Sequence, residues 1–186
     1  IVLKKRKISA LRPSKNTIYY KLGKGKHIFA QQIKEETNMG RLKIAVIGCG
    51  GISGVHLAAY AQNPNVEIYA LCDINEQNLQ RRAKEYGVER LYADKDQMLR
   101  ELPELDAVSV CTWNSAHAEC AIAALNAGKH VMCEKPVTMN AAELEQIIAA
   151  AEKNQRVFTA HQNRRWNADY LMVKQVVDSK EIGNIT

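Results

Sequence analysis

The sequence predicts an α/β fold, in which helices cover both faces of a doubly wound parallel sheet, and three observations support this prediction. From residue 39 onward, short apolar segments alternate with longer amphipathic ones. The apolar segment at 107–111 is continuous, as is typical of a strand that is buried on both faces. The apolar segment at 43–47 ends in a glycine cluster, which indicates a tight turn from strand to helix.

The predicted elements follow one another in a regular order, and residues that break secondary structure separate them. Asn140 is the expected N-cap of the last long helix, because Glu143 follows it three residues later. The breaking residues are, in order, Asn63-Pro64-Asn65, Gly87, Pro103 and Gly128. The predicted strands span 43–47, 66–72, 91–93, 107–111, 129–133 and 156–160, and the predicted helices span 54–62, 76–86, 96–101, 116–127 and 140–154.

The glycine cluster after the first strand has the form of a dinucleotide-binding turn. Gly48 lets the chain leave the strand, Gly50 lets the backbone approach a pyrophosphate, and the small Ser53 lets helix and strand pack closely. The turn, which includes Gly51 and Ile52, would present free N–H groups of a helix N-terminus to the anion. This pattern predicts a Rossmann-type domain, although a plain glycine-rich turn explains such a pattern when it stands alone.

An acidic residue at the end of the second strand strengthens this interpretation. Asp73 follows an apolar strand about two dozen residues after Gly48, where Rossmann folds place the carboxylate that binds the adenosine ribose. Such a carboxylate would repel the 2′-phosphate of NADP, so the sequence favours NAD, with NADP the less favoured cofactor. Arg81 or Arg82 could still reach such a phosphate from the following helix, and the alternative role for Asp73 is that of a turn or N-cap carboxylate.

The excess of positive over negative charge is confined to the first 38 residues of the chain. Residues 1–38 carry ten Lys or Arg and two Glu, whereas residues 39–186 carry sixteen basic and eighteen acidic side chains. This basic N-terminal segment shows no sustained period, and nucleic-acid binding through it would rest on charge alone. We favour a second hypothesis, in which Met39 is the true start, because Lys34-Glu35-Glu36 back-translates to a purine-rich codon run like a ribosome-binding site.

The cysteine pattern and the apolar content of the sequence predict a cytoplasmic protein. Five cysteines show no Cys-x-x-Cys pair, which favours buried apolar thiols in a reducing compartment. No apolar run approaches the length of a membrane span. No metal set is expected either, because the sequence places the relevant histidines on different elements with no short ligand spacing; these are His56, His117, His130 and His161.

A candidate for catalysis follows the fifth predicted strand. Lys135 stands between Glu134 and Pro136 at the carboxyl end of that strand, where ligands bind in open parallel sheets. Its ammonium group could donate a proton or a hydrogen bond to a substrate oxygen. The alternative is an ordinary surface lysine in a turn, which would be preferred for an isolated lysine.

Three blocks together resemble the glucose-fructose oxidoreductase and inositol dehydrogenase family, Gfo/Idh/MocA. They are Gly48-x-Gly50-Gly51-x-Ser53-x-x-His56, Cys111-Thr112-Trp113-Asn114-x-x-His117 and Ala127-Gly128-Lys129-His130-Val131-Met132-Cys133-Glu134-Lys135-Pro136. The resemblance implies an NAD(P)-dependent oxidoreductase that moves a hydride between the nicotinamide and a sugar, inositol or related polyol. The complete protein would take a small-molecule substrate and form a homo-oligomer, with no nucleic-acid or membrane partner.

The resemblance also implies roles for individual residues. Lys135 would touch the reacting hydroxyl, with Glu134 as its partner near the nicotinamide ribose. The cofactor would be lined by residues after the fourth strand, of which Trp113 departs from the more usual proline; these are Thr112, Trp113, Asn114 and His117. Gln162, Arg165 and Trp166 are weaker candidates after the sixth strand. For His56 and His117, a packing role is an equal alternative.

The resemblance covers only the first part of such enzymes. It implies residues 39–160 as the NAD(P)-binding domain, and 161–186 as a linking helix with the first strand of a second α/β domain that is otherwise missing. That domain would supply further acid–base groups, so the chain is expected to bind NAD with little turnover. The alternative is a dinucleotide-binding module or subunit without catalysis.

Overall fold

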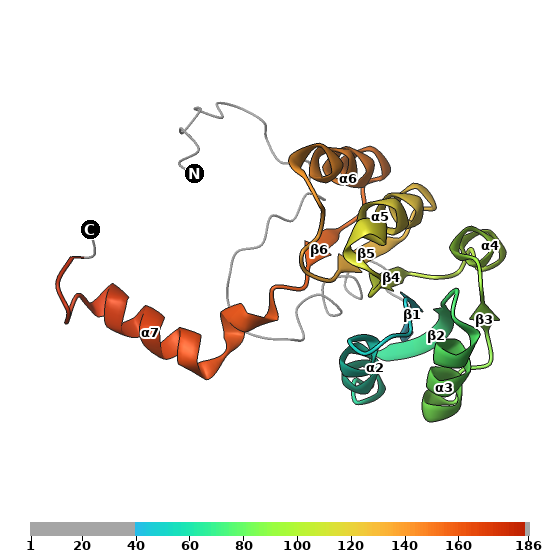
Figure 1. The fold of residues 1–186 in the computed structure, drawn as a ribbon, viewed down its shortest axis with the longest axis horizontal. Coiled ribbons are helices and arrows are strands. Elements are labelled where there is room, and N and C mark those ends of the chain that lie inside the picture. The colour runs from blue at the N-terminus through green and yellow to red at the C-terminus, as the bar shows by residue number, and fades with distance from the viewer. Residues whose placement is uncertain (1–39, 185–186) are drawn as a thin grey trace.

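The sheet of this protein has the doubly wound order that the sequence predicted. The structure is a computed structural model that describes residues 40–184, so the basic N-terminal segment and Met39 lie outside the described residues. Six parallel strands are arranged in the order β3-β2-β1-β4-β5-β6 (Figure 1). They are β1 (Leu42–Ile47), β2 (Val66–Cys72), β3 (Leu91–Tyr92), β4 (Ala107–Val110), β5 (His130–Cys133) and β6 (Phe158–Ala160).

The helices lie on both faces of this sheet. Alternate residues of β1 enter different cores: Val46 packs in one core, whereas Ala45 and Ile47 pack in the other. The first core includes Leu57 of α2 and the second includes Ile147 of α6. The helices are α2 (Ser53–Ala61), α3 (Glu76–Tyr86), α4 (Lys95–Glu101), α5 (His117–Asn126), α6 (Ala141–Asn154) and α7 (Ala168–Ser179), with 3₁₀ turns η1 (Asn114–Ala116) and η2 (Asn163–Trp166).

Side-chain caps define where the long helices begin. Asn140 accepts a hydrogen bond from the Glu143 backbone N–H over 3.0 Å, as predicted, and the Glu143 carboxylate accepts one from Met139 N over 2.9 Å. This pair is similar to a capping box, but the Glu143 carboxylate accepts from Met139, which precedes the N-cap, while the Asn140 contact satisfies a donor that the first helical turn leaves free. A different helix, α3, ends at Gly87, whose φ of +67° is a left-handed conformation that terminates the helix.

The structure shortens several predicted elements, for local reasons. The predicted strand at 156–160 begins only at Phe158, because the Arg156 N–H bonds to Ala151 O and completes the end of α6. The predicted helix at 116–127 begins with the 3₁₀ turn η1. Residues 181–184 form no strand: Gly183 N donates to Lys180 O in a turn, so the predicted strand at 181–186 is wrong within its described part.

Helix α7 differs from all the others because none of its side chains is buried. It extends away from the sheet (Figure 1) and exposes several apolar side chains, which include Leu171, Met172 and Val173. Among residues 40–184, none of the helices has the length and apolar character that crossing a membrane requires.

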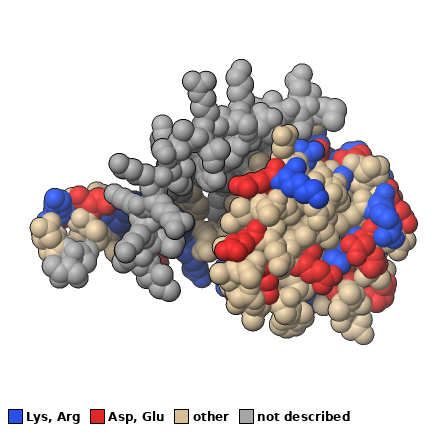
Figure 2. Space-filling model, turned by 90° about the horizontal axis from the view of Figure 1, so that it is seen from above, with Lys and Arg blue, Asp and Glu red and all other residues tan. Residues whose placement is uncertain are grey.

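Charged side chains of both signs share the surface. Figure 2 shows Lys and Arg next to Asp and Glu on one face, without a continuous basic field. The five cysteines all lie in the described part and are free and buried, and burial raises the pKa of the Cys49 thiol to about 12. They therefore contribute to packing rather than to thiolate chemistry.

Candidate functional site

The strand order reverses at β1, and this point opens a crevice at the carboxyl edge of the sheet. Gly48 ends β1 with φ +94°, and a Cβ atom there would lie 2.6 Å from the carbonyl carbon and oxygen of Cys111. Only glycine can therefore bring the end of β1 so close to the end of β4. The predicted role of Gly48 in the turn has this physical basis.

The turn after Gly48 presents unpaired backbone donors. Cβ atoms built at Gly50 and Gly51 would meet no atom within 4 Å, so the turn is open on the side where those atoms would point. No acceptor within residues 40–184 pairs with the N–H groups of Gly51 and Ile52. Ser53 is buried and its hydroxyl donates to Gly50 O over 2.7 Å. Open space beside free amides fits a pyrophosphate group.

A cleft of about 660 Å³ lies along this turn and between the ends of β1, β2 and β4. Of the predicted site residues, those that line it are Gly48, Gly50, Gly51, Ile52, Asp73, Thr112 and Trp113. A second cavity of about 680 Å³ lies at the opposite edge and includes Lys129 and Arg156. Because ligands of open parallel sheets bind at the carboxyl edge, the first cleft is the candidate site.

Asp73 is fixed at the rim of the cleft by backbone hydrogen bonds. One carboxylate oxygen accepts from Cys49 N over 2.6 Å, and the other accepts from Asn75 N over 2.7 Å. The N-cap of α3 is Asn75 and not Asp73. Arg82 does not reach toward Asp73, because its guanidinium donates to Gly50 O over 3.0 Å. Arg81 Nη2 donates to Cys49 O over 3.4 Å, and the contact of either arginine with a 2′-phosphate stays a prediction.

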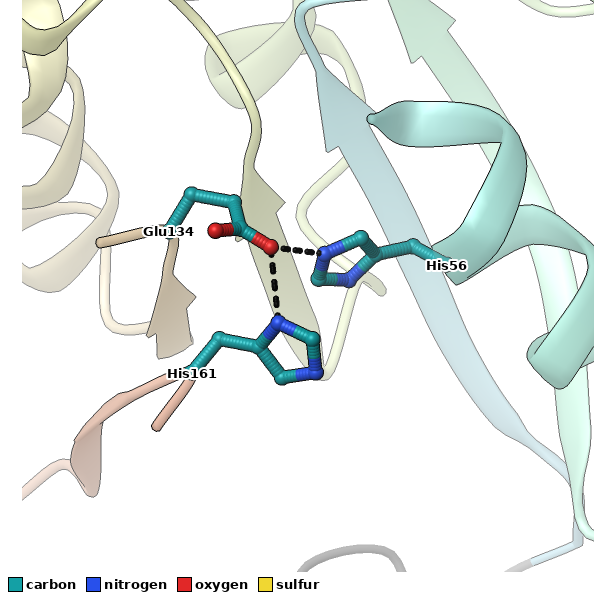
Figure 3. A group of neighbouring side chains, drawn as sticks. All are labelled: His56, Glu134 and His161. Atoms are coloured by element: carbon teal, nitrogen blue, oxygen red, sulfur yellow. Dashed lines mark hydrogen bonds and ion pairs between the residues drawn. The ribbon is translucent and has the colours of Figure 1, made fainter. Parts of the chain in front are cut away.

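Glu134 forms the centre of a buried cluster at the end of β5. One carboxylate oxygen, Oε1, accepts from His56 Nε2 and His161 Nδ1, each over 2.7 Å (Figure 3). The other accepts from the Lys135 backbone N–H over 3.0 Å. Burial alone would raise the pKa of Glu134, but the hydrogen bonds from the two histidines lower it below its usual value. Glu134 is therefore held as a carboxylate.

The cluster joins three segments that are far apart in the sequence. His56 comes from α2, Glu134 follows β5 and His161 follows β6 (Figure 3). His56 Nδ1 lies 3.2 Å from the Ser109 hydroxyl, which can donate to it while Nε2 donates to Glu134. Burial lowers the pKa of His56. The imidazole is therefore neutral and acts as a fixed link between β4 and Glu134.

The same cluster corrects one sequence-based argument. His56 and His161 do lie on different elements, but the fold brings them together, so their separation in sequence did not exclude a common site. With Glu134, they form a group whose ligand atoms all lie within 4.8 Å of one another. The 2.7 Å contacts to Glu134 are hydrogen-bond distances, which account for the arrangement without an ion. The expectation that no metal binds stays a prediction.

His117 and Lys135 occupy contrasting positions next to this cluster. His117 is buried, with Nδ1 2.8 Å from Pro136 O and Nε2 3.1 Å from Thr112 O. It connects the loops after β4 and β5, which is a packing role and not a place in the cleft lining. The Lys135 side chain is exposed, while its backbone is fixed by Glu134.

The remaining predicted residues lie outside the lining of the cleft. Asn114 begins η1 and is exposed. Gln162, Arg165 and Trp166 belong to or precede η2 and are also exposed. The structure therefore does not bring these four side chains to the glycine turn. Sequence analysis also missed His161 and Ser109 as partners, because their contacts depend on strand order.

Comparison with known proteins agrees with the geometry. The model of the Gfo/Idh/MocA oxidoreductases, a family with an NAD-binding Rossmann fold, matches residues 42–162. The match confirms the resemblance that the sequence motifs indicated. It also confirms NAD as the cofactor of the group.

Individual relatives match over a similar range. The chain is 32% identical to myo-inositol 2-dehydrogenase of Thermotoga maritima over 76% of this chain and 42% of that protein. It is 36% identical to inositol 2-dehydrogenase of Salmonella typhimurium over 76% of this chain and 43% of that protein. The crystal structure of an NAD-binding protein from Listeria innocua superposes with a TM-score of 0.71 at 35% identity, over 77% of this chain and 42% of that one. The chain thus spans less than half the length of these relatives.

Proposed function

Because the chain belongs to the Gfo/Idh/MocA oxidoreductase family with an NAD-binding Rossmann fold, we propose that it supplies the cofactor half of a dehydrogenase site. The substrate would be a sugar, inositol or related polyol, since two of the matched relatives are inositol 2-dehydrogenases. The observation that carries the proposal is the open turn at Gly50 and Gly51, with unpaired N–H groups beside the cleft.

Bound NAD would supply the hydride acceptor, and the residues of this chain would bind and orient it. The N–H groups of Gly51 and Ile52 face no protein acceptor within the described residues and would bind the pyrophosphate. Asp73 stands at the end of β2 and would accept the ribose hydroxyls, which favours NAD over NADP. Thr112 and Trp113 line the same cleft from the end of β4.

Lys135 would assist removal of the proton from the substrate hydroxyl. Its side chain is exposed at the carboxyl edge, whereas its backbone N–H is bonded to Glu134. Glu134 itself accepts hydrogen bonds from two histidines, so the segment that carries the lysine is fixed in place. A rigid segment of this kind supplies the fixed orientation that proton transfer requires.

The remainder of a complete site would come from outside this chain. The chain spans about 42% of the Thermotoga maritima relative, and we propose that residues 161–186 begin a second domain. Without it, substrate orientation and water exclusion are incomplete, so the 186-residue chain should turn over little. A cytoplasmic location and a homo-oligomer for the complete protein belong to the same proposal.

Titration of the 186-residue chain with NADH, followed by nicotinamide fluorescence, tests the cofactor proposal. We expect saturable binding, and weaker binding of NADPH because of Asp73. Absence of any saturable change with NADH would overturn the proposal. Robust sugar- or inositol-dependent NADH production by this chain would instead contradict the expected lack of turnover.

The alternative is a dinucleotide-binding module without catalysis, and substitution of the exposed Lys135 side chain tests it. Any assembly that contains this chain and reduces NAD with a polyol should lose kcat on Lys135→Met, with the Kd for NADH unchanged. Lys153→Met removes another exposed lysine, from α6, and should change neither quantity. Equal activity in both variants would favour the module.

A further inference from the structure

We propose that Arg82 is a positioning residue for the dinucleotide, because it holds the glycine turn from behind and orients the N–H groups that bind the pyrophosphate. The inference rests on the proposed function but adds a residue on α3, outside the glycine motif. The sequence suggested Arg82 only as a partner for a 2′-phosphate. The contacts described next assign it a different task.

The guanidinium of Arg82 lies against the carbonyl side of the turn. One terminal nitrogen, Nη2, donates to Gly50 O over 3.0 Å and to Gly51 O over 3.3 Å. The other, Nη1, forms an ion pair of 2.6 Å with Glu85, one helical turn further along α3. The Arg82 side chain is only 13% exposed. It is therefore enclosed between α3 and the turn.

Peptide planarity links these contacts to the opposite face of the turn. In a trans peptide the carbonyl of one residue and the N–H of the next point in opposite directions. The Gly50 and Gly51 carbonyls face Arg82, so the N–H groups of Gly51 and Ile52 point away from it. Those two N–H groups have no acceptor in the described part of the chain. Gly50, Gly51 and Ile52 all line the cleft. The Ser53 hydroxyl and Gly54 N also donate to the Gly50 and Gly51 carbonyls, over 2.7 and 3.3 Å, and Arg82 is the charged donor, from another helix, that fixes the same orientation of the free N–H groups.

Two further observations indicate that the arrangement serves the turn. Within residues 40–184, the Nε–H of Arg82 is buried without a hydrogen-bond partner, an arrangement that costs free energy, so the terminal nitrogens make the contacts that hold this side chain in place. A Cβ atom at Gly54 would lie 2.6 Å from Nη2, so the absence of a side chain at Gly54 makes room for the guanidinium. The positive charge also lies behind the donors that would face a dianion.

Binding of cofactor fragments to the full 186-residue chain tests the inference. NADH and ADP-ribose contain the pyrophosphate, whereas adenosine lacks it. Arg82→Met should weaken NADH and ADP-ribose about tenfold, since charge-assisted hydrogen bonds to the turn are lost, and should leave adenosine within about twofold. Lys84→Met removes the same charge from an exposed position on α3 and should change none of the three.

A second variant keeps the test valid if Arg82→Met unfolds the chain. Gly54→Ala retains the arginine but displaces it, and should produce the same selective loss for NADH and ADP-ribose. The double variant should bind as weakly as either single one, because both changes act on one contact. An unchanged Kd for ADP-ribose, or an equal loss for adenosine, would overturn the inference. If the unaltered chain binds no NADH at all, the proposed function fails first.

Discussion

The two halves of the carboxyl edge are built in opposite ways. The half that contains the glycine turn presents backbone groups, with the small Ser53 packed at the turn and Arg82 behind it. The half that contains Glu134 is built from side chains, with Glu134 and His56 buried and His161 half-buried, which bond to one another from α2 and from the ends of β5 and β6. The first half thus depends on glycines that have no side chain, and the second on hydrogen bonds to one carboxylate.

This difference predicts different consequences of mutation. A methyl group added to the glycine turn should destabilise the fold where it points at the protein backbone, and should weaken ligand binding where it points into the cleft. A charge removed from the Glu134 cluster should instead leave buried donors without an acceptor, which costs stability wherever it occurs. The following predictions test this contrast.

The largest effect is expected from Gly48→Ala. Its φ of +94° and the 2.6 Å approach to the Cys111 backbone leave no room for a side chain, so we expect a loss of about 3 kcal/mol in the free energy of unfolding. Gly50→Ala is the matched control, because its Cβ would meet no atom within 4 Å. It should cost little stability but weaken NADH binding. Urea unfolding together with NADH titration measures both; equal stability of the two variants would contradict the prediction.

The next largest effect is expected from Glu134→Gln. The amide keeps the size of the side chain but offers one acceptor where the carboxylate now bonds His56, His161 and the Lys135 N–H. We expect a loss of roughly 2 kcal/mol in the free energy of unfolding. Glu145→Gln on the exposed face of α6 should change it by less than about 0.5 kcal/mol. Similar unfolding midpoints for both variants would show that the cluster is not stabilising.

A smaller effect is expected from pH. Burial lowers the pKa of His56 and lowers that of His130 from 6.5 to about 4. Below about pH 6.5 the unfolded chain therefore binds more protons at these positions than the folded chain does, so stability should fall as the pH decreases. For His130 we expect a loss of about 1 kcal/mol between pH 7.5 and 5.5, and His56 should add a loss in the same direction.

The variant His130→Asn sharpens the pH prediction. Its side-chain oxygen can still accept from Val157 N, as His130 Nδ1 does over 3.0 Å, but it does not titrate. Unfolding of this variant at the two pH values should show a smaller difference than the unaltered chain. The Glu134 carboxylate contributes in the same direction only at lower pH, because its pKa is lowered from 4.5. An identical pH dependence in the variant would contradict the assignment.

The smallest effect concerns α7, which lies apart from both halves. Its Leu171, Met172 and Val173 side chains are 45%, 67% and 62% exposed. Exposed apolar side chains on one helix favour self-association, so light scattering should give a mass above that of one chain. Leu171→Glu combined with Val173→Glu should lower that mass without changing NADH binding. A monomer before substitution would contradict this prediction.

Local sequence was sufficient for the half of the site that one continuous segment forms. Gly48, Gly50, Gly51, Ile52 and Asp73 line the predicted cleft, because glycine conformations and strand ends are encoded by near neighbours. The doubly wound parallel sheet and the cap at Asn140 were also predicted, from the alternation of elements and from the Asn140–Glu143 spacing. The weaker candidates, such as Gln162 and Arg165, followed from a resemblance alone, and the described structure does not place them in the cleft.

Tertiary structure decided how distant residues meet. His56 and His161 are separated by more than one hundred positions, yet both bond Glu134, because β5 lies between β4 and β6 in the sheet. Arg82 meets the glycine turn only because α3 packs beside it. The sequence by itself determined the fold and the open turn, since backbone conformation is local. Only the tertiary structure determined which side chains hold that turn and which bond Glu134, because such contacts depend on strand order and helix placement.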